Sequence, residues 1–451
     1  MLKGEETQIK LIFFFLGILL SLPSNIIINV SFLINNIYNE EISITILGFI
    51  SGFMIISSLI QLTFEFTSFK SIIICNFLNA ANLFIFLILI CLCNASKHYI
   101  YIISAFIGFF IGFLYSANTK YSLLFGMRIN GYLVSGISFC ALFFFIINLL
   151  MSYLTIEDGN VKSYYNAITL SIGTVVVLKV LIIIYIIFMH LRSPYFLEQK
   201  ERIESRKTKE INIDSELNTF NEVENGENNL SKGVSSYDKN SNDNDDKKIE
   251  VTVKDNISKI SKINKKLKFP KKIFNCNNII DGARLIKYYY LCLIPISFNI
   301  FITFVIYPHI IPNKLKKGVY YKYLFMFLFQ CSDLIFSFLV TVYLNLFSFF
   351  KQQYVTILCI CRILLLVLAY KIKNLQEDSF LYTNEFIAFV IFLVGSTNGS
   401  LINLSYGRIC DCFKHSDQKE KNIAVSSSFC ALTFLISFAL SPWFCGLIID
   451  S

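Results

Sequence analysis

Eleven long apolar segments, separated by short polar or charged stretches, constrain this chain more than any other feature of its sequence. They cover residues 11–35, 43–64, 71–93, 99–119, 129–154, 165–190, 285–311, 319–346, 353–371, 384–406 and 422–448. A helix rises 1.5 Å per residue, so about 20 apolar residues cross the roughly 30 Å of hydrocarbon in a bilayer. Because no water at that depth can satisfy the backbone, each segment predicts a transmembrane α-helix. The chain is therefore predicted to be an all-α polytopic membrane protein with about 11 transmembrane helices.

The composition agrees with this class and disfavours others. Hydrophobic residues make up 55% of the 451 residues and charged residues only 16%, whereas soluble domains carry about 25% charge. The first segment is too long for a signal peptide and is predicted to be a retained span. The net charge of +9 lies in loops, without the pattern of a nucleic-acid module. None of the closest cysteine pairs, Cys91/Cys93, Cys359/Cys361 and Cys410/Cys412, has zinc-site spacing, so we expect no metal and no nucleic-acid partner.

A hydrophilic segment divides the apolar segments into six and five. Residues 200–272 hold 17 of the 40 Lys and Arg residues and 14 of the 31 Asp and Glu residues. Low hydrophobicity with mixed charge predicts a disordered loop over 197–275. Arg192, Arg284 and Lys287 flank it, which places the loop in the cytosol by the positive-inside rule. We therefore expect a six-helix bundle over 1–196 and a five-helix bundle over 276–451.

Three charged residues lie deep inside predicted spans, away from the span ends, where charges are costly and commonly functional. Asp333 is in the middle of the eighth span and needs a partner, for which Arg362 of the ninth span is the first candidate. Such a pair either lines a solute path or pins two helices together. Lys179 is in the middle of the sixth span. It either snorkels toward the interface, which its stem would barely reach from this position, or serves the path or pairs with Asp333.

Prolines and small residues form a second group of candidates. Pro23 and Pro308 each interrupt a predicted helix and free backbone carbonyls for neighbours or solute. His309, next to Pro308, is a candidate gate or proton site. Ser135 belongs to a small-residue cluster in the fifth span, and the spacing of Gly108 and Gly112 permits close helix contact.

No sequence motif indicates catalysis or ATP-driven pumping. A Walker loop, a nucleophile elbow, an H-E-x-x-H motif and a dinucleotide fingerprint are all missing from the sequence. We expect no enzyme activity and no cofactor. Gradient-driven transport of a small polar solute is the function that the spans predict.

The order of several motifs resembles the equilibrative nucleoside transporter family. In chain order, the matching residues are Gly17 with Leu22-Pro23-Ser24-Asn25, GYLVSGI at 131–137, RSPYF at 192–196, Tyr307-Pro308, Asp333, Arg362 and Thr397-Asn398-Gly399-Ser400. The family has eleven spans and a large loop after the sixth, as here. The chain departs from the family pattern at Ser24, at Phe336-Ser337 after Asp333, and at Ser400, which makes it similar to a divergent member.

The resemblance implies a 6+5 arrangement of major-facilitator-like type and transport of purine nucleosides or nucleobases by alternating access. Solute would bind between the first, fourth, fifth, seventh, eighth and tenth spans. Asp333 and Arg362 would fix the central geometry, and Asn25 and Asn398 would hydrogen-bond the ribose or base. The implied partners are the bilayer and a nucleoside or nucleobase, with or without protons. We expect a monomer, in the plasma membrane.

Two alternatives stay open at this point. One is a major-facilitator carrier for a sugar, an amino acid or a drug, which normally has twelve spans and a Gly-x-x-x-Asp-Arg loop after the second. The segment FEFTSFK at 64–70 lacks that loop motif. The other is a non-transporting membrane scaffold or receptor that works through its cytosolic loop.

Overall fold

The structure is a computed structural model. It describes most of the chain on either side of the hydrophilic segment, with short gaps. The described residues are 3–38, 40, 42–64, 68–93, 95–155, 161–193, 196–198, 201, 277–311, 315, 317–347, 350–375, 379–416 and 418–445. The loop predicted over 197–275 lies outside the described residues, apart from 197, 198 and 201. Residues Met1–Leu197 and Cys276–Ser451 belong to one compact unit, and the fold is described for that unit alone.

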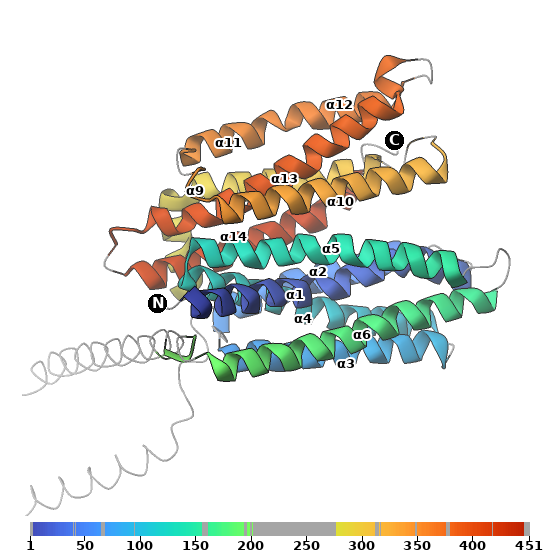
Figure 1. The fold of residues 1–451 in the computed structure, drawn as a ribbon, viewed down its shortest axis with the longest axis horizontal. Coiled ribbons are helices and arrows are strands. Elements are labelled where there is room, and N and C mark those ends of the chain that lie inside the picture. The colour runs from blue at the N-terminus through green and yellow to red at the C-terminus, as the bar shows by residue number, and fades with distance from the viewer. Residues whose placement is uncertain are drawn as a thin grey trace, which may run out of the picture. The chain divides into compact units, whose positions relative to one another are not determined.

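Within the described residues, every regular element is a helix (Figure 1). The first half of the chain forms α1 (Lys3–Tyr38), α2 (Ile42–Phe64), α3 (Phe69–Cys91), α4 (Lys97–Phe125), α5 (Met127–Thr155) and α6 (Val161–Arg192). The second half forms α9 (Asn277–Phe304), the π-helical η1 (Val305–Ile310), α10 (Val319–Val342), α11 (Gln352–Cys361), α12 (Ile363–Lys373), the 3-10 helix η2 (Phe380–Tyr382), α13 (Asn384–Cys412) and α14 (Lys419–Phe444).

The described helices contain 11 segments that are long and apolar enough to span a membrane, which confirms the predicted number. Two spans are interrupted in ways that the apolar pattern alone did not show. The seventh passes from α9 into η1, where Tyr307 has extended dihedrals next to Pro308, which confirms the interruption predicted there. The ninth is divided into α11 and α12 at Arg362. The interruption predicted at Pro23 is wrong, since α1 continues through that residue.

The predicted end of the fourth span was wrong because Lys120 does not end the helix. The fourth span was expected to stop at residue 119, but α4 continues through the buried Lys120 to Phe125. The turn into α5 is made at Gly126, whose φ of 122° is a conformation that glycine adopts without steric cost.

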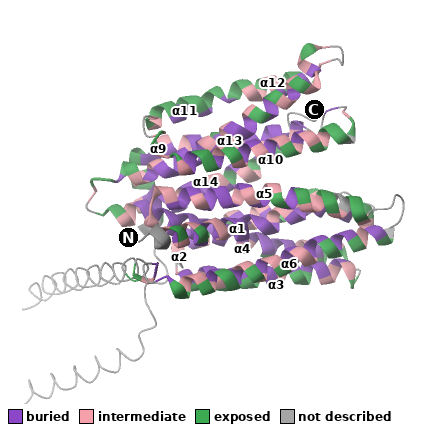
Figure 2. Ribbon diagram, in the orientation of Figure 1, coloured by how far each residue is buried: buried purple, intermediate pink, exposed green. Residues whose placement is uncertain are grey.

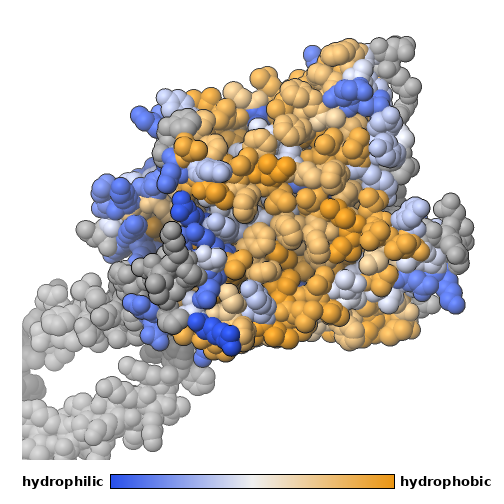
Figure 3. Space-filling model, in the orientation of Figure 1, coloured by the Kyte–Doolittle hydropathy of each residue, from blue (hydrophilic) through white to orange (hydrophobic). Residues whose placement is uncertain are grey.

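The distribution of polar residues is the inverse of that in a soluble protein. Phe84, Ile184 and Leu364 are more than half exposed, whereas Asn79 and Asn118 are completely buried. Figure 2 shows exposed positions along the outer helices, and Figure 3 shows an apolar surface between two more hydrophilic ends. This pattern fits helices whose outer faces contact lipid.

Close helix pairs depend on glycine in the first half. In α4, a Cβ atom at Gly108 or Gly112 would collide with the backbone of Ile50 or Met54 in α2. The predicted role of the Gly108/Gly112 spacing in close packing is therefore confirmed. Gly17 of α1 approaches the backbone of α5 in the same way, so α1 and α5 are held at short range.

The two halves contact each other through a few helices. In the first half α1 packs on α5, and α2 on α4; in the second half α9 packs on α14, and α10 on α13. Between the halves, α5 lies against α10 and α13, while α2 and α4 lie against α14. The side chains at these contacts are where the buried polar groups of the two halves meet.

Candidate functional site

Asp333 lies on α10 and is 8% exposed. Its Oδ1 atom accepts a hydrogen bond from Nδ2 of Asn398 on α13, at 2.7 Å. The Ser138 hydroxyl of α5 lies within hydrogen-bonding reach of the same carboxylate. A carboxylate at this depth is thus stabilised by neutral donors from both halves of the chain, rather than by a cation in direct contact.

Asn398 connects Asp333 to α9. Its Oδ1 atom accepts a hydrogen bond from Nδ2 of Asn299, at 3.0 Å, and lies 2.9 Å from the hydroxyl of Thr303. Asn299 and Thr303 are four residues apart on α9 and therefore share one face of that helix. The amide of Asn398 consequently donates toward Asp333 and accepts from the α9 side.

Arg362 completes the network from the junction of α11 and α12, where it is 2% exposed. Its Nη2 atom donates to the Thr303 hydroxyl at 2.8 Å and to the Val394 carbonyl at 3.2 Å. Its Nη1 atom donates to the Asn299 carbonyl at 3.3 Å. The guanidinium is therefore surrounded by oxygen acceptors from α9 and α13.

The direct pairing of Asp333 with Arg362 suggested by the sequence is not formed. Among the ion pairs of the described residues, none joins the two side chains, and Asn398 and Thr303 lie between them. We call Asp333, Asn398, Asn299, Thr303 and Arg362 the central network. It keeps two opposite charges in one polar system while neutral groups occupy the space between them.

Some polar atoms of the central network and its surroundings lack a hydrogen-bond partner within the described protein. Nε of Arg362 and Oδ1 of Asn299 are buried without a hydrogen-bond partner. The same holds for Oε1 of Gln330, which lies three residues before Asp333 on α10. Buried polar groups are normally satisfied. One donor and two acceptors are therefore available here to a polar solute or to water.

The two halves meet beside the central network through hydroxyl groups. Ser135 of α5 lies 3.1 Å from the Thr341 hydroxyl and 3.3 Å from the Ser337 hydroxyl, both on α10. Asn403 of α13 donates to the Ser337 backbone carbonyl at 3.0 Å. Gly131, one turn before Ser135, provides the space for Thr341. The predicted candidate Ser135 thus lies at an interface between helices of the two halves.

Further contacts between the halves lie toward the helix ends near Arg192 and Asn277, which we call the loop end. The hydroxyls of Tyr115 on α4 and Tyr406 on α13 are 3.3 Å apart. Tyr115 also stacks on Phe434 of α14, with ring centroids 4.5 Å apart. Together with the Ser135 contacts, these rings hold helices of the two halves together on the side of the loop end.

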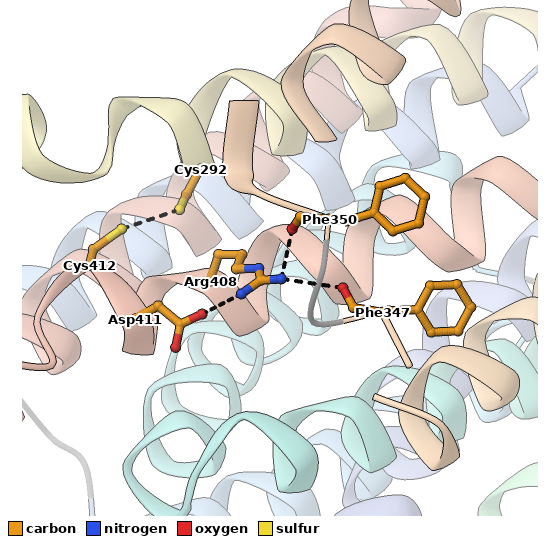
Figure 4. A network of polar contacts seen from close by, with 6 residues as sticks. All are labelled: Cys292, Phe347, Phe350, Arg408, Asp411 and Cys412. Atoms are coloured by element: carbon orange, nitrogen blue, oxygen red, sulfur yellow. Dashed lines mark hydrogen bonds and ion pairs between the residues drawn. The ribbon is translucent and has the colours of Figure 1, made fainter. Parts of the chain in front are cut away.

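Arg408 organises the loop end of α13, as Figure 4 shows. It pairs with Asp411 at 2.7 Å and donates to the carbonyls of Phe350 at 2.7 Å and Phe347 at 3.3 Å. Because both carbonyls belong to the connection between α10 and α11, Arg408 attaches that connection to α13. The Arg408 side chain is only 17% exposed, so these protein contacts hold it in place.

Among the described hydrogen bonds, none joins Asn25 or Lys179 to the central network. Asn25 is half-buried on α1 and donates to the Cys140 thiol of α5 at 3.9 Å. Lys179 is fully buried and donates to the Leu19 carbonyl at 3.1 Å and to Oδ1 of Asn79 at 2.8 Å. The suggested pairing of Lys179 with Asp333 is therefore not formed. Its partners are neutral groups of α1 and α3.

Pro308 and His309 lie in η1, both half-buried. The preceding residue, Tyr307, stacks on Phe329 of α10 with ring centroids 3.9 Å apart, and its hydroxyl accepts from Nε2 of Gln330 at 3.4 Å. The break at Pro308 thus brings an aromatic side chain of the seventh span against α10, the helix that carries Asp333.

The sequence analysis missed three partners in the site. Asn299 and Thr303 could have been found from two polar residues spaced four apart in an apolar run, which places both on one helix face. Ser138 was indistinguishable from the many other serines of the spans. The described residues contain no group of three or more His, Cys, Asp or Glu side chains that could hold a metal ion.

Comparison with known proteins identifies the fold. No protein-family model matches the chain, and no curated protein matches it either. Among solved structures, the proton:xylose symporter XylE bound to 6-bromo-6-deoxy-D-glucose is similar at a TM-score of 0.58 and 13% identity, over 98% of this chain and 89% of that one. The E. coli fucose:proton symporter FucP is similar at a TM-score of 0.57 and 12% identity, over 98% and 92%.

A second XylE structure, the partially occluded inward-open xylose transporter from E. coli, is similar at a TM-score of 0.54 and 12% identity, over 98% and 91%. These neighbours belong to the major facilitator superfamily by their descriptions. The chain therefore has the same fold as these structures, with eleven candidate spans in the described residues. At identities this low, the similarity establishes the fold alone.

Proposed function

We propose that this protein carries purine nucleosides or nucleobases across a membrane by alternating access, driven by the gradient of the solute. The observation that carries the proposal is the central network, in which Asp333 and Arg362 are buried in one polar system and joined through Asn398 and Thr303. Charges at membrane depth are costly and are found mostly at solute or ion pathways.

The charge balance of the network favours a neutral solute. Asp333 and Arg362 carry opposite charges, so an incoming solute needs no counter-charge of its own. The atoms without partners, Nε of Arg362 and Oδ1 of Asn299, offer one donor and one acceptor. The edge of a purine base, or the diol of a ribose, presents the complementary acceptor and donor. Purine nucleobases and nucleosides are both uncharged.

The contacts at the loop end suit a gate that opens repeatedly. Ser135, Thr341 and Ser337 interact through hydroxyl groups, as do Tyr115 and Tyr406. A neutral hydrogen bond contributes only about 0.5–1.5 kcal/mol because water replaces the lost partner on opening. The two halves can therefore separate at this end at modest cost, which alternating access requires.

A second candidate is proton-coupled transport of a sugar. The similar structures are described as symporters of xylose or fucose with protons, and Asp333 is a buried carboxylate that such a mechanism could protonate. Sugars share the neutral charge and the adjacent hydroxyl groups of ribose. The plasma membrane remains the proposed location for either solute.

Uptake measurements separate the candidates. Labelled adenosine, hypoxanthine and glucose are offered to a host that lacks its own carriers and expresses this chain. The proposal expects saturable adenosine or hypoxanthine uptake, which Asp333→Ala abolishes while surface expression is unchanged. Glucose uptake without nucleoside uptake would favour the sugar carrier, and no uptake of any of the three would contradict the proposal.

A further inference from the structure

A proline in α1 leaves one backbone carbonyl without its helical hydrogen-bond donor. Pro23 lies inside α1. Proline has no backbone N–H, so the carbonyl four residues earlier, at Leu19, receives no intrahelical hydrogen bond. In the interior of a membrane protein an unsatisfied carbonyl costs several kcal/mol. Some other donor therefore has to reach Leu19.

Lys179 of α6 is that donor. Its Nζ atom lies 3.1 Å from the Leu19 carbonyl oxygen, and its side chain is 0% exposed. The same nitrogen donates to Oδ1 of Asn79 on α3 at 2.8 Å. Asn79 in turn donates to the Ile107 carbonyl of α4 at 3.3 Å. The proline site of α1 is thus tied to α6, α3 and α4 through one lysine.

A second proline of the chain is treated in the same way. Pro295 lies inside α9 and frees the carbonyl of Leu291, which accepts hydrogen bonds from Gln352 and Thr356 of α11. Pro295 precedes Asn299 by one turn, as Pro23 precedes Asn25 by half a turn. Each of these helices therefore carries a predicted or observed site residue just beyond a proline whose freed carbonyl is held by a neighbouring helix.

Neutral donors satisfy the Leu291 carbonyl that Pro295 frees. A separate reason is therefore needed for a lysine as the donor to the Leu19 carbonyl that Pro23 frees. Among the ion pairs of the described residues, none involves Lys179. The useful property of Lys179 is the length of its flexible side chain. The amine reaches from α6 to the backbone of α1 and can follow the Leu19 carbonyl when α1 moves.

We infer that Lys179 is a positioning residue for α1: its amine replaces the N–H that Pro23 lacks and thereby holds the following segment, with Asn25, in its binding orientation. Lys179 was first considered as a pathway residue or a partner of Asp333. Its contacts assign it instead to the geometry of a helix that the pathway uses.

A double-mutant cycle tests the first part of the inference. Melting of the full chain in detergent is measured for the wild type, Lys179→Met, Pro23→Ala and the double variant. Alanine at 23 restores a backbone N–H for the Leu19 carbonyl. Lys179→Met is therefore expected to lower the melting temperature clearly in the parent chain and much less in the Pro23→Ala background. Equal losses in both backgrounds would overturn the inference.

Uptake kinetics test the positioning role, and this arm alone rests on the proposed function. Lys179→Met is expected to raise the KM for the solute about tenfold, the equivalent of one hydrogen bond to a charged group, with a smaller change in Vmax. Lys179→Gln retains an N–H donor and should recover part of the loss. Lys371→Met removes an exposed lysine at the end of α12 and is the control.

The outcomes are distinguishable from failure of the proposed function. If the wild type transports none of the solutes, the proposed function fails, while the melting cycle still decides whether Lys179 serves the Pro23 site. If the melting cycle shows coupling but Lys179→Met leaves KM unchanged, Lys179 is only structural and the positioning role is overturned.

Discussion

The carboxylate of Asp333 and the guanidinium of Arg362 are linked through Asn398 and Thr303 and do not form an ion pair of their own. A buried ion pair recovers its desolvation cost only when the geometry and the remaining hydrogen bonds are excellent. Here Asp333 and Arg362 each have their own hydrogen-bond partners. The neutral side chains of Asn398 and Thr303 connect the two charged groups by hydrogen bonds. A solute that rearranges Asn398 or Thr303 would therefore alter the surroundings of both charges at once.

Thr303→Val removes the hydroxyl that joins Arg362 to Asn398 while keeping the shape of the side chain. The loss leaves an Arg362 donor unpaired, which costs about 1.5–3 kcal/mol for a bond to a charged group. We expect uptake to fall at least tenfold at normal surface expression. Thr433→Val is the matched control, because the Thr433 hydroxyl bonds only the carbonyl of its own helix in the described contacts; equal losses for the two variants would contradict the role of Thr303.

Asn398→Leu breaks the network at its centre. Asp333 loses its 2.7 Å donor, and Asn299 loses the acceptor of its side-chain N–H. We expect both a lower melting temperature and abolished uptake, with a larger loss than for Thr303→Val because Asp333 and Asn299 each lose their shortest side-chain hydrogen bond to Asn398. Melting curves and uptake at saturating solute measure the two effects. A variant with normal uptake would show that solute does not use the network.

The loop end should be lockable by a covalent bond between the halves. The Ser135 and Thr341 hydroxyls are 3.1 Å apart, so cysteines at both positions are close enough to form a disulfide under a mild oxidant. We expect oxidation to stop uptake by the Ser135→Cys/Thr341→Cys variant and a reductant to restore it, because the halves can no longer separate there. Each single variant is the control for the native cysteines; continued uptake by the cross-linked protein would exclude opening at this interface.

Gly108→Ala should destabilise the protein, whereas Gly173→Ala should not. The added Cβ at Gly108 collides with the α2 backbone at Ile50, but the same atom at Gly173 meets nothing within 4 Å. Both glycines are helical, so the propensity gain from alanine is the same, about 1 kcal/mol. The melting temperatures of the two variants show whether the collision at Gly108 costs more stability than the helix propensity of alanine adds. A stable Gly108→Ala protein would mean that α2 and α4 are not in close contact.

Uptake is expected to follow the solute gradient without a proton gradient. Asp333 already accepts a hydrogen bond from Asn398 and shares its network with Arg362, so the site is charge-balanced before solute enters. Collapsing the proton gradient with a protonophore should leave initial uptake rates unchanged between pH 6 and pH 8. Inhibition by the protonophore would instead support the proton-coupled candidate.

The spans were predictable because their signal is physical and local. A run of about 20 apolar residues has few alternatives to a membrane helix, and all eleven were found. Asp333, Arg362 and Lys179 were identifiable because a charge inside such a run is rare. Their partners were not, since which side chains meet depends on how helices far apart in sequence pack. The spacing of Asn299 and Thr303 indicates a shared helix face, but only the fold places Thr303 beside Arg362 and Leu19 beside Lys179.

The break at Arg362 illustrates the same limit. The run from Tyr354 to Tyr370 is apolar apart from Thr356 and this residue, and it predicts one helix. The structure divides it at Arg362, where the side chain turns inward to the oxygens of α9 and α13. Interactions outside the segment decide its geometry, and they cannot be read from its own residues.

The most direct test of the account is solute counterflow by the purified full chain in proteoliposomes, comparing adenosine, hypoxanthine and glucose for the wild type and Asp333→Ala. The account predicts that vesicles preloaded with adenosine or hypoxanthine accumulate the labelled form of that solute, and that Asp333→Ala vesicles do not. Accumulation of glucose alone, or purine accumulation that persists in Asp333→Ala, would contradict it.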